Sequence, residues 1–131
     1  MERTAINPWP WSLSFGFNQG ELVEGGARVL FLSGQTSVDA DGGPQHPGDM
    51  AAQISLAVDN LEAVLADAGM SLANVVRLNF YTTDVDEFLA NSAVLGARTG
   101  AAGIAPASTL LGVARLAFPE LMIEMEATAV A

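Results

Sequence analysis

The chain of 131 residues contains no cysteine and no lysine, and it has a single histidine, His46. Without cysteine there is no disulfide, no thiolate nucleophile and no thiolate metal site. Without lysine there is no amine to form a Schiff base, and one histidine alone disfavours a structural zinc site. These absences exclude several common classes of enzyme and metalloprotein, and they allow a reducing compartment.

Charge is also scarce and is mostly of one sign. Charged residues make up 15% of the chain, with 5 basic residues, all arginine, against 15 acidic ones and a net charge of −10. Such a chain is a poor partner for nucleic acid, because binding needs cations that neutralise phosphates. The sequence has no apolar run of about 18 residues and no signal-peptide pattern at its start. We therefore expect a cytoplasmic protein with no membrane span.

Half of the residues are hydrophobic, which predicts a single folded domain over 1–131 with an N-terminal arm at 1–14. The arm carries Trp9 and Trp11, and we interpret it as a docking anchor rather than a ligand cage. In chain order we expect an extended arm over 7–14, strands over 15–23 and 28–33, a helix capped by Asp49 and stopped by Gly69, a strand over 75–83, a helix from Asp84 to about Arg98, and strands over 108–116 and 121–130.

This order predicts an α+β fold in which two helices cover one face of a sheet. The nearly continuous apolar run at 28–33 favours a strand buried on both faces. We expect apolar side chains on the face that the helices leave open. Each Å² of apolar area left exposed to water there would cost roughly 25 cal/mol. Neighbouring copies of the chain would cover that face, so we expect a homo-oligomer.

Several short motifs follow one another along the chain. They are Phe17-Asn18-Gln19-Gly20, Leu32-Ser33-Gly34-Gln35, Met50-Ala51-Ala52-Gln53 leading to Asn60-Leu61, Pro106-Ala107-Ser108-Thr109, Val113-Ala114-Arg115-Leu116 and Ile123-Glu124-Met125-Glu126-Ala127. In this order and spacing they resemble the RidA/YjgF family, also called the L-PSP endoribonuclease family. The resemblance implies a chorismate-mutase-like α+β fold with a mixed sheet, and a homotrimer whose sheets form a central barrel with ligand clefts between subunits. It further implies hydrolysis of small reactive enamines and imines without a cofactor or metal.

The resemblance also assigns site residues. Glu124 matches the family glutamate that orients or activates water, and Ser33 and Gly34 match a Ser-Gly pair on the cleft floor. Phe17 stands at a tyrosine position, and Ser108 stands where the family has an arginine that binds the substrate carboxylate. Each hydrogen bond to a charged group contributes roughly 1.5–3 kcal/mol, so we expect a ligand that is neutral or differently charged.

Other functions stay open at this point. The paired acids Glu124 and Glu126 lie on one face of a strand, and we interpret Glu126 as structural. The first hypothesis is a RidA-like hydrolytic deaminase with an altered substrate preference. The alternative is a non-catalytic trimer that binds a small ligand. An endoribonuclease is disfavoured by the net charge of −10 and by the missing lysines.

Overall fold

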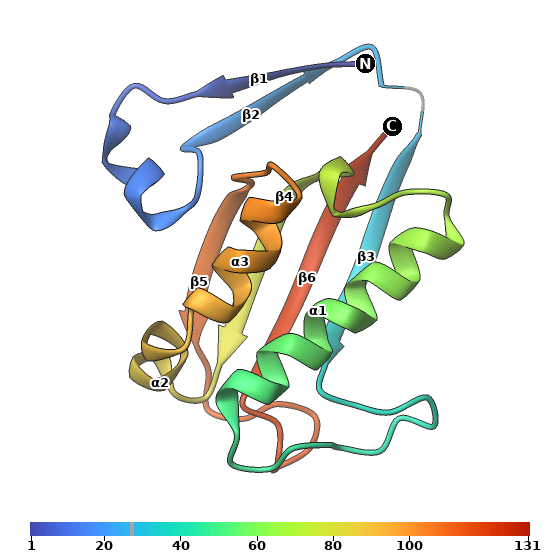
Figure 1. Ribbon diagram of the computed structural model, residues 1–131, viewed down its shortest axis with the longest axis vertical. Helices are drawn as coiled ribbons and strands as arrows, with labels where there is room; N and C mark the ends of the chain where they lie inside the picture. Colours follow the sequence, from blue (N-terminus) through green and yellow to red (C-terminus); the bar gives the residue numbers. More distant parts are fainter. Residues whose placement is uncertain (27) are drawn as a thin grey trace.

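The computed structural model describes residues 1–26 and 28–131. Figure 1 shows a four-stranded sheet with helices in front of it and a separate two-stranded hairpin, β1 and β2, across one end. The elements are β1 (Glu2–Ile6), the 3-10 helix η1 (Pro10–Phe15), β2 (Gly20–Glu24), β3 (Val29–Thr36), α1 (Met50–Asp67), the 3-10 helix η2 (Leu72–Asn74), β4 (Val75–Thr82), α2 (Val85–Ala90), α3 (Ala93–Ala101), β5 (Ala107–Gly112) and β6 (Ile123–Val130).

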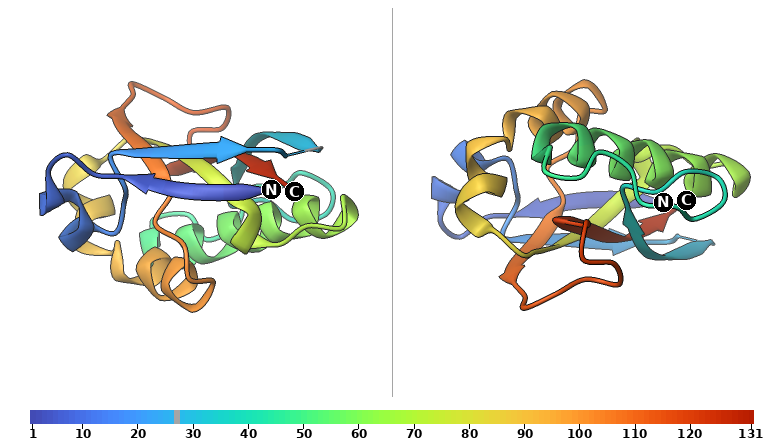
Figure 2. Two further views of the ribbon diagram at one scale, coloured as in Figure 1. Left: turned by 90° about the horizontal axis from the view of Figure 1, so that it is seen from above. Right: turned by 90° about the horizontal axis from the view of Figure 1, so that it is seen from below.

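The main sheet has the strand order β3-β6-β4-β5. β6 is antiparallel to both of its neighbours, whereas β4 and β5 are parallel, so the sheet is mixed. The helices cover one face and leave the other open, as the views along the sheet show (Figure 2). The predicted α+β fold, with helices on one face of a mixed sheet, is confirmed. Among the described residues, no helix combines the length and the apolar character that crossing a membrane requires.

Helix α1 forms where its cap and its apolar spacing predict it. The Asp49 side chain accepts a hydrogen bond from the Ala52 N–H at 3.0 Å, which satisfies one free donor of the first turn. Ile54, Leu61 and Leu65 recur at helical spacing and are buried. They form one cluster with the buried side chains of β4 and β6, and this cluster is the core between helix and sheet.

Two amides on α1 fix the ends of the strands. Gln53 is fully buried, and its Nε2 donates to the backbone oxygens of His46 and Glu120 at 3.0 and 2.8 Å. Its Oε1 accepts from the Met122 N–H at 2.8 Å. Asn60 Nδ2 donates to the carbonyl of Thr36 at 2.8 Å. Both motif residues therefore hold loops against α1.

The N-terminal segment differs from the expected extended arm and long strand. Residues 2–6 form β1, and residues 10–15 form η1, whose start is favoured by the fixed φ of Pro10. Gly16 then turns the chain at a φ of +81°, so the next strand, β2, begins only at Gly20. The expected strand over 15–23 was thus too long, and β1 was missed.

The second helical region was predicted as one helix, but the structure splits it into α2 and α3. Asn91 Nδ2 donates to the Glu87 carbonyl at 2.9 Å, and Ser92 Oγ donates to the Leu89 carbonyl at 2.9 Å. Side chains that bond backbone carbonyls in this way compete with the regular helical pattern. The predicted strand over 108–116 is also shorter, and β5 ends at Gly112.

The open face of the sheet is more polar than predicted. Its central strands present Asn79, Tyr81 and Glu126, and only the flanking strands add large apolar side chains such as Phe31. Phe31 is 79% exposed, so the expected burial of 28–33 on both faces was wrong for the single protomer. The cause is the position of β3 at the sheet edge, where α1 covers one face only.

Candidate functional site

Glu124 lies on the open face of β6, directly against the backbone of β3. A Cβ atom added to Gly34 would lie 2.6 Å from Glu124 Cδ and 2.9 Å from Glu124 Oε2. Gly34 sits where the register between β3 and β6 shifts, between Leu32 and Gln35. The glycine thus leaves space that the Glu124 side chain fills. Ser33, beside it, is exposed.

The Glu124 carboxyl group favours its protonated form more than an ordinary glutamate does. Partial burial raises its pKa above the usual 4.5, and the nearby charge of Glu126 raises the pKa further. In the part of the chain that the structure describes, the ion pairs join Arg3 to Glu21 and Arg98 to Asp59 and Glu62, and none involves Glu124. An acid of this kind is suited to giving and taking protons.

Glu126, two residues further on, is held by its neighbours on β4. Tyr81 Oη donates to Glu126 Oε1, and Asn79 Nδ2 donates to the same oxygen at 3.3 Å. The hydrogen bond to Glu126 is the largest of the effects that raise the Tyr81 pKa above 10.0. These contacts fit the structural role that the sequence suggested for Glu126.

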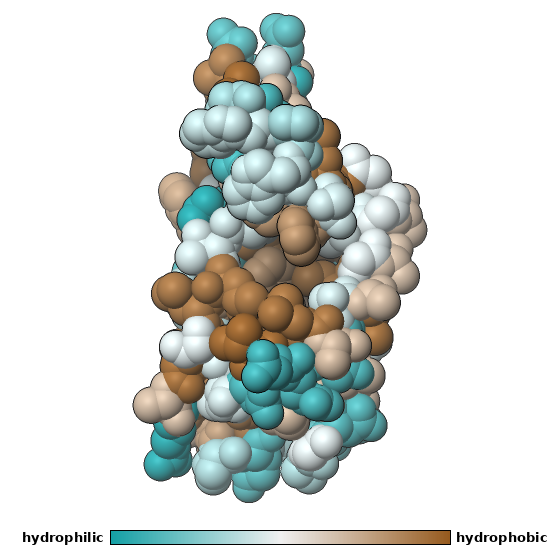
Figure 3. Space-filling view, turned by 90° about the vertical axis from the view of Figure 1, so that its left-hand side faces the viewer, coloured by the Kyte–Doolittle hydropathy of each residue, from teal (hydrophilic) through white to brown (hydrophobic). Residues whose placement is uncertain are grey.

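Phe17 and Ser108 line a cavity of about 660 Å³ on the other side of the sheet. Ser108 pairs with the buried Leu78 in the parallel register of β4 and β5, which places it on the helix side. Its Oγ donates to the Pro106 carbonyl at 3.2 Å. Figure 3 views the molecule from the side of α2 and η1, and apolar side chains gather there around a hollow.

The five predicted site residues therefore form two groups within one protomer. Ser33, Gly34 and Glu124 belong to the open face, and none of them lines either of the two main cavities. Phe17 and Ser108 belong to the cavity under the helices. Neither of these two cavities contains both groups.

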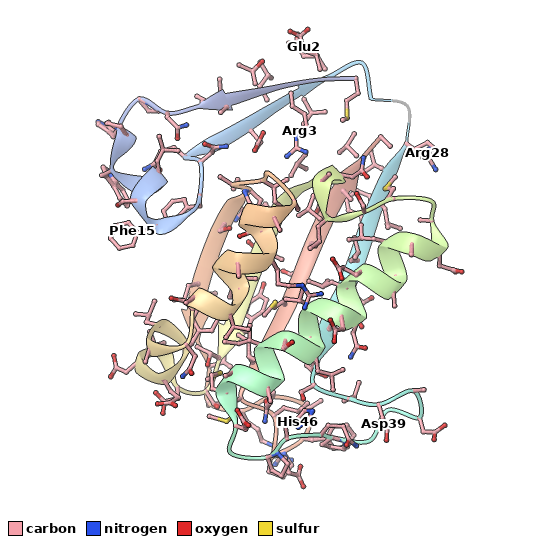
Figure 4. The ribbon with its side chains drawn as sticks, in the orientation of Figure 1. Glu2, Arg3, Phe15, Arg28, Asp39 and His46 are labelled. Carbon is pink, nitrogen blue, oxygen red and sulfur yellow. The ribbon has the colours of Figure 1, made fainter. Side chains whose placement is uncertain are left out.

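The cavity also contains residues that the sequence reasoning did not assign to a site. Trp11 and Phe15 of η1 form part of its wall, and Ser92 and Thr99 add hydroxyl groups from the α2–α3 region. Trp11 was noticed in the sequence, but its contact with Phe17 depends on the turn at Gly16. His46, by contrast, lies in the loop at the far end of the molecule from Phe15 (Figure 4).

No metal site is formed by the described residues, since no three His, Asp or Glu side chains in 1–26 and 28–131 are grouped to hold an ion. The second cavity, of about 580 Å³, lies beside Arg3 and Glu21 under the β1–β2 hairpin. Its only described charged groups, Arg3 and Glu21, are paired with each other at 3.5 Å. It therefore offers no free charge for chemistry.

Comparison with known proteins supports the resemblance. The sequence is 32% identical over 104 residues to the 2-iminobutanoate/2-iminopropanoate deaminase of Escherichia coli K12, covering 79% of this chain and 80% of that protein. The fold matches YyfB of Yersinia pestis, a protein of the conserved Rid family, with a TM-score of 0.89, 36% identity and full coverage of both chains. It also matches Escherichia coli TdcF with bound serine, with a TM-score of 0.71, 27% identity and coverage of 97% and 91%.

The family described as Endoribonuclease L-PSP matches residues 17–131, which is most of the chain. The match begins at Phe17 and includes every residue of the two groups described above. The first 16 residues, with β1 and η1, lie outside it. The chain belongs to the Endoribonuclease L-PSP family, the family also called RidA/YjgF.

Proposed function

We propose that this protein is a cytoplasmic, homotrimeric deaminase that hydrolyses small reactive enamines and imines, with Glu124 as the group that activates water. The supporting observation is the half-buried Glu124 carboxyl, which has a raised pKa and rests against the Gly34 backbone. The relatives named as iminobutanoate and iminopropanoate deaminases support the reaction class.

The proposed chemistry needs only water and one carboxyl group. Glu124 takes a proton from water as the oxygen attacks the carbon of the C=N bond, and the proton is passed to the nitrogen. Collapse of the resulting carbinolamine breaks the C–N bond and releases ammonia, leaving the keto or aldehyde product. The raised pKa of Glu124 favours the second of these proton transfers, in which the protonated carboxyl group donates to the nitrogen.

We further propose that the two residue groups meet across a subunit interface. In one protomer, Glu124 and Gly34 lie on the open face and Ser108 and Phe17 lie under the helices, so they belong to opposite sides of the sheet. A second copy packed on the open face can place its cavity opposite Glu124. The exposed Phe31 on that face gives the contact apolar area.

The proposed preference is for substrates that present no carboxylate to Ser108. The residues that line its cavity carry no charged side chain, and Ser108 offers one hydroxyl. A carboxylate placed there would lose its hydration without gaining a cation. Imines without a carboxylate at this point therefore bind better.

The central test compares Glu124→Gln with the wild type on imines generated in the assay by an amino-acid or amine oxidase. Ammonia and carbonyl products are followed after each addition. We expect the substitution to lower the catalysed rate at least a hundredfold, since general acid–base groups contribute about that much or more. Glu126→Gln is the matched control, and we expect it to keep most of the rate. Equal rates for Glu124→Gln and wild type would exclude the role assigned to Glu124.

A non-catalytic trimer that binds a small ligand is the second candidate. The observation in its favour is the uncharged cavity around Ser108, which lacks the cation expected of a carboxylate-binding deaminase. Saturable binding of small amides or keto acids, without product release from any imine offered, would favour this candidate over the deaminase.

A further inference from the structure

The first 16 residues fold as an integral wall of the molecule, although they lie outside the family match. Arg3 on β1 donates to the Val75 carbonyl at 2.8 Å and pairs with Glu21 on β2 at 3.5 Å. Figure 4 shows Arg3 pointing from the hairpin toward the body of the protein. The hairpin is therefore fixed to the start of β4.

A second set of hydrogen bonds fixes the part of the arm nearest the cavity. Asn7 Nδ2 donates to Asn18 Oδ1 at 2.8 Å, and Asn7 Oδ1 accepts from the Gln19 N–H at 2.8 Å. The Asn18 N–H donates to the Ala105 carbonyl at 2.9 Å, just before β5. These bonds enclose η1 from both ends, so its position relative to Ser108 is defined.

The aromatic residues of this wall are organised around Trp11. Its ring lies 5.8 Å from the Phe17 ring and 6.2 Å from the Phe15 ring, with edge-to-face angles of 85° and 76°. Trp11 is nevertheless 56% exposed, and Phe15 is 75% exposed. Trp11 is thus held by its neighbours while much of its surface remains free to contact a ligand.

The opposite wall of the cavity is apolar as well. It is made by side chains of β4, β5 and the α2–α3 region, and hydroxyl groups of Ser92, Thr99 and Ser108 interrupt it. A volume of about 660 Å³ falls within the range of small-molecule sites, which are typically apolar with a few placed polar groups. The large apolar members of this wall are Leu78, Phe80, Phe88, Leu89, Leu95 and Leu110.

We propose that Trp11 is a specificity-determining residue, and that the cavity it borders receives an uncharged apolar side chain of the substrate, preferably an aromatic ring. This inference rests on the proposed function, because it assigns the substrate's side chain to one half of that site. A planar ring gains edge-to-face contacts with Trp11 and Phe17 that a methyl group cannot make. The hydroxyl groups near Ser108 satisfy the polar end of the substrate.

The first experiment measures selectivity between two imines that differ only in the side chain. The imines of phenethylamine and ethylamine, which carry no carboxylate, are generated by an amine oxidase, and kcat/KM is compared between them. We expect the wild type to prefer the aromatic imine at least tenfold, and Trp11→Ala to lower that ratio about tenfold. Trp9→Ala is the matched control, because Trp9 lies on the same arm and does not line the cavity.

The second experiment detects binding without turnover. In Trp9→Phe the only remaining tryptophan is Trp11. Titration with phenylacetamide should change its fluorescence saturably, at a concentration at least tenfold lower than acetamide requires. In Trp11→Phe, where Trp9 alone reports, we expect no saturable change. Because both substitutions keep an aromatic ring, the arm retains its packing.

The outcomes separate the two proposals. Saturable binding of phenylacetamide with no imine hydrolysis would refute the proposed function and support the assignment of the cavity. Hydrolysis without aromatic preference, or without a response of Trp11 to phenylacetamide, would overturn the role of Trp11 and leave the deaminase intact. If a side chain of a neighbouring copy fills the cavity, the titration will likewise show no fluorescence change, and the proposed role of Trp11 will be overturned.

Discussion

The ionisation of Glu124 gives the site a measurable dependence on pH. Burial and the charge of Glu126 raise the Glu124 pKa in the folded protein above its ordinary 4.5. The folded state then keeps a proton over a pH range in which the unfolded chain has lost it. The stability that this proton contributes is complete below the unfolded pKa and is lost as pH rises through the folded pKa.

Glu124→Gln removes this titration. We therefore expect the variant to gain stability relative to wild type as pH rises from the ordinary pKa of about 4.5 through the raised pKa of Glu124 in the folded protein. Thermal unfolding at a series of pH values measures the difference. Glu120→Gln, which removes an exposed acid, controls for the loss of one negative charge. Unfolding temperatures of wild type and Glu124→Gln that change in parallel with pH would contradict the prediction.

Ser108 allows a test of how a cation at this position changes the substrate preference. We expect Ser108→Arg to raise kcat/KM for the imine of alanine roughly tenfold or more, because a guanidinium forms charge-assisted hydrogen bonds to the carboxylate. The imine of ethylamine, which has no carboxylate, should gain nothing. Ser108→Leu is the control for changed size alone. An equal response of both imines to the arginine would show that Ser108 does not face the carboxylate.

For single residues, the sequence predicted some relative positions of side chains and missed others. Alternation along β6 placed Glu124 and Glu126 on one face, and the structure confirms this because Met125 between them is buried. The separation of Ser108 from Glu124 was not predictable, since it follows from the parallel pairing of β5 with β4. Such a register joins distant segments and leaves no local pattern in the sequence.

Among the elements, α1 depends on Gln53 for its connection to the sheet. We expect Gln53→Met, which keeps the size of the side chain, to cost about 3 kcal/mol or more of unfolding free energy, because three backbone groups lose their hydrogen bonds to the buried amide. Denaturant titration measures this cost. Ser55→Ala, on the same helix, is the control and should change stability by at most about 0.5 kcal/mol. A loss as small as that of the control would mean that water replaces the amide.

The elements differ in how far the sequence determines them. α1 was predicted because its cap, its periodicity and the stop at Gly69 agree. β1 was missed because its short Glu-Arg-Thr-Ala-Ile run has little apolar alternation, and it becomes a strand only through pairing with β2. The division between α2 and α3 depends on side-chain bonds from Asn91 and Ser92, which compete with helix continuation.

For the whole molecule, the open face of the sheet predicts an assembly of copies, and the family resemblance predicts that there are three of them. We expect light scattering after size exclusion to give three times the 13.6 kDa of one chain, about 41 kDa. Phe31→Asp should yield a folded monomer with the mass of one chain, because Phe31 is exposed in the protomer and a charge there opposes burial at an interface. Ala63→Asp, on the exposed side of α1, is the control that should stay assembled. A wild-type mass equal to that of one chain would exclude a site shared between subunits.

The position of β6 has a consequence for biosynthesis. The last strand of the chain lies in the middle of the sheet, between β3 and β4, and the backbone groups of Arg28 bond those of Ala131 at the very end. When only residues 1–122 have left the ribosome, β3 and the β4–β5 pair have been made, but the strand that joins them is still missing. The four-stranded sheet can form only after β6 has left the ribosome, and until then the growing polypeptide exposes unpaired strand edges that chaperones recognise.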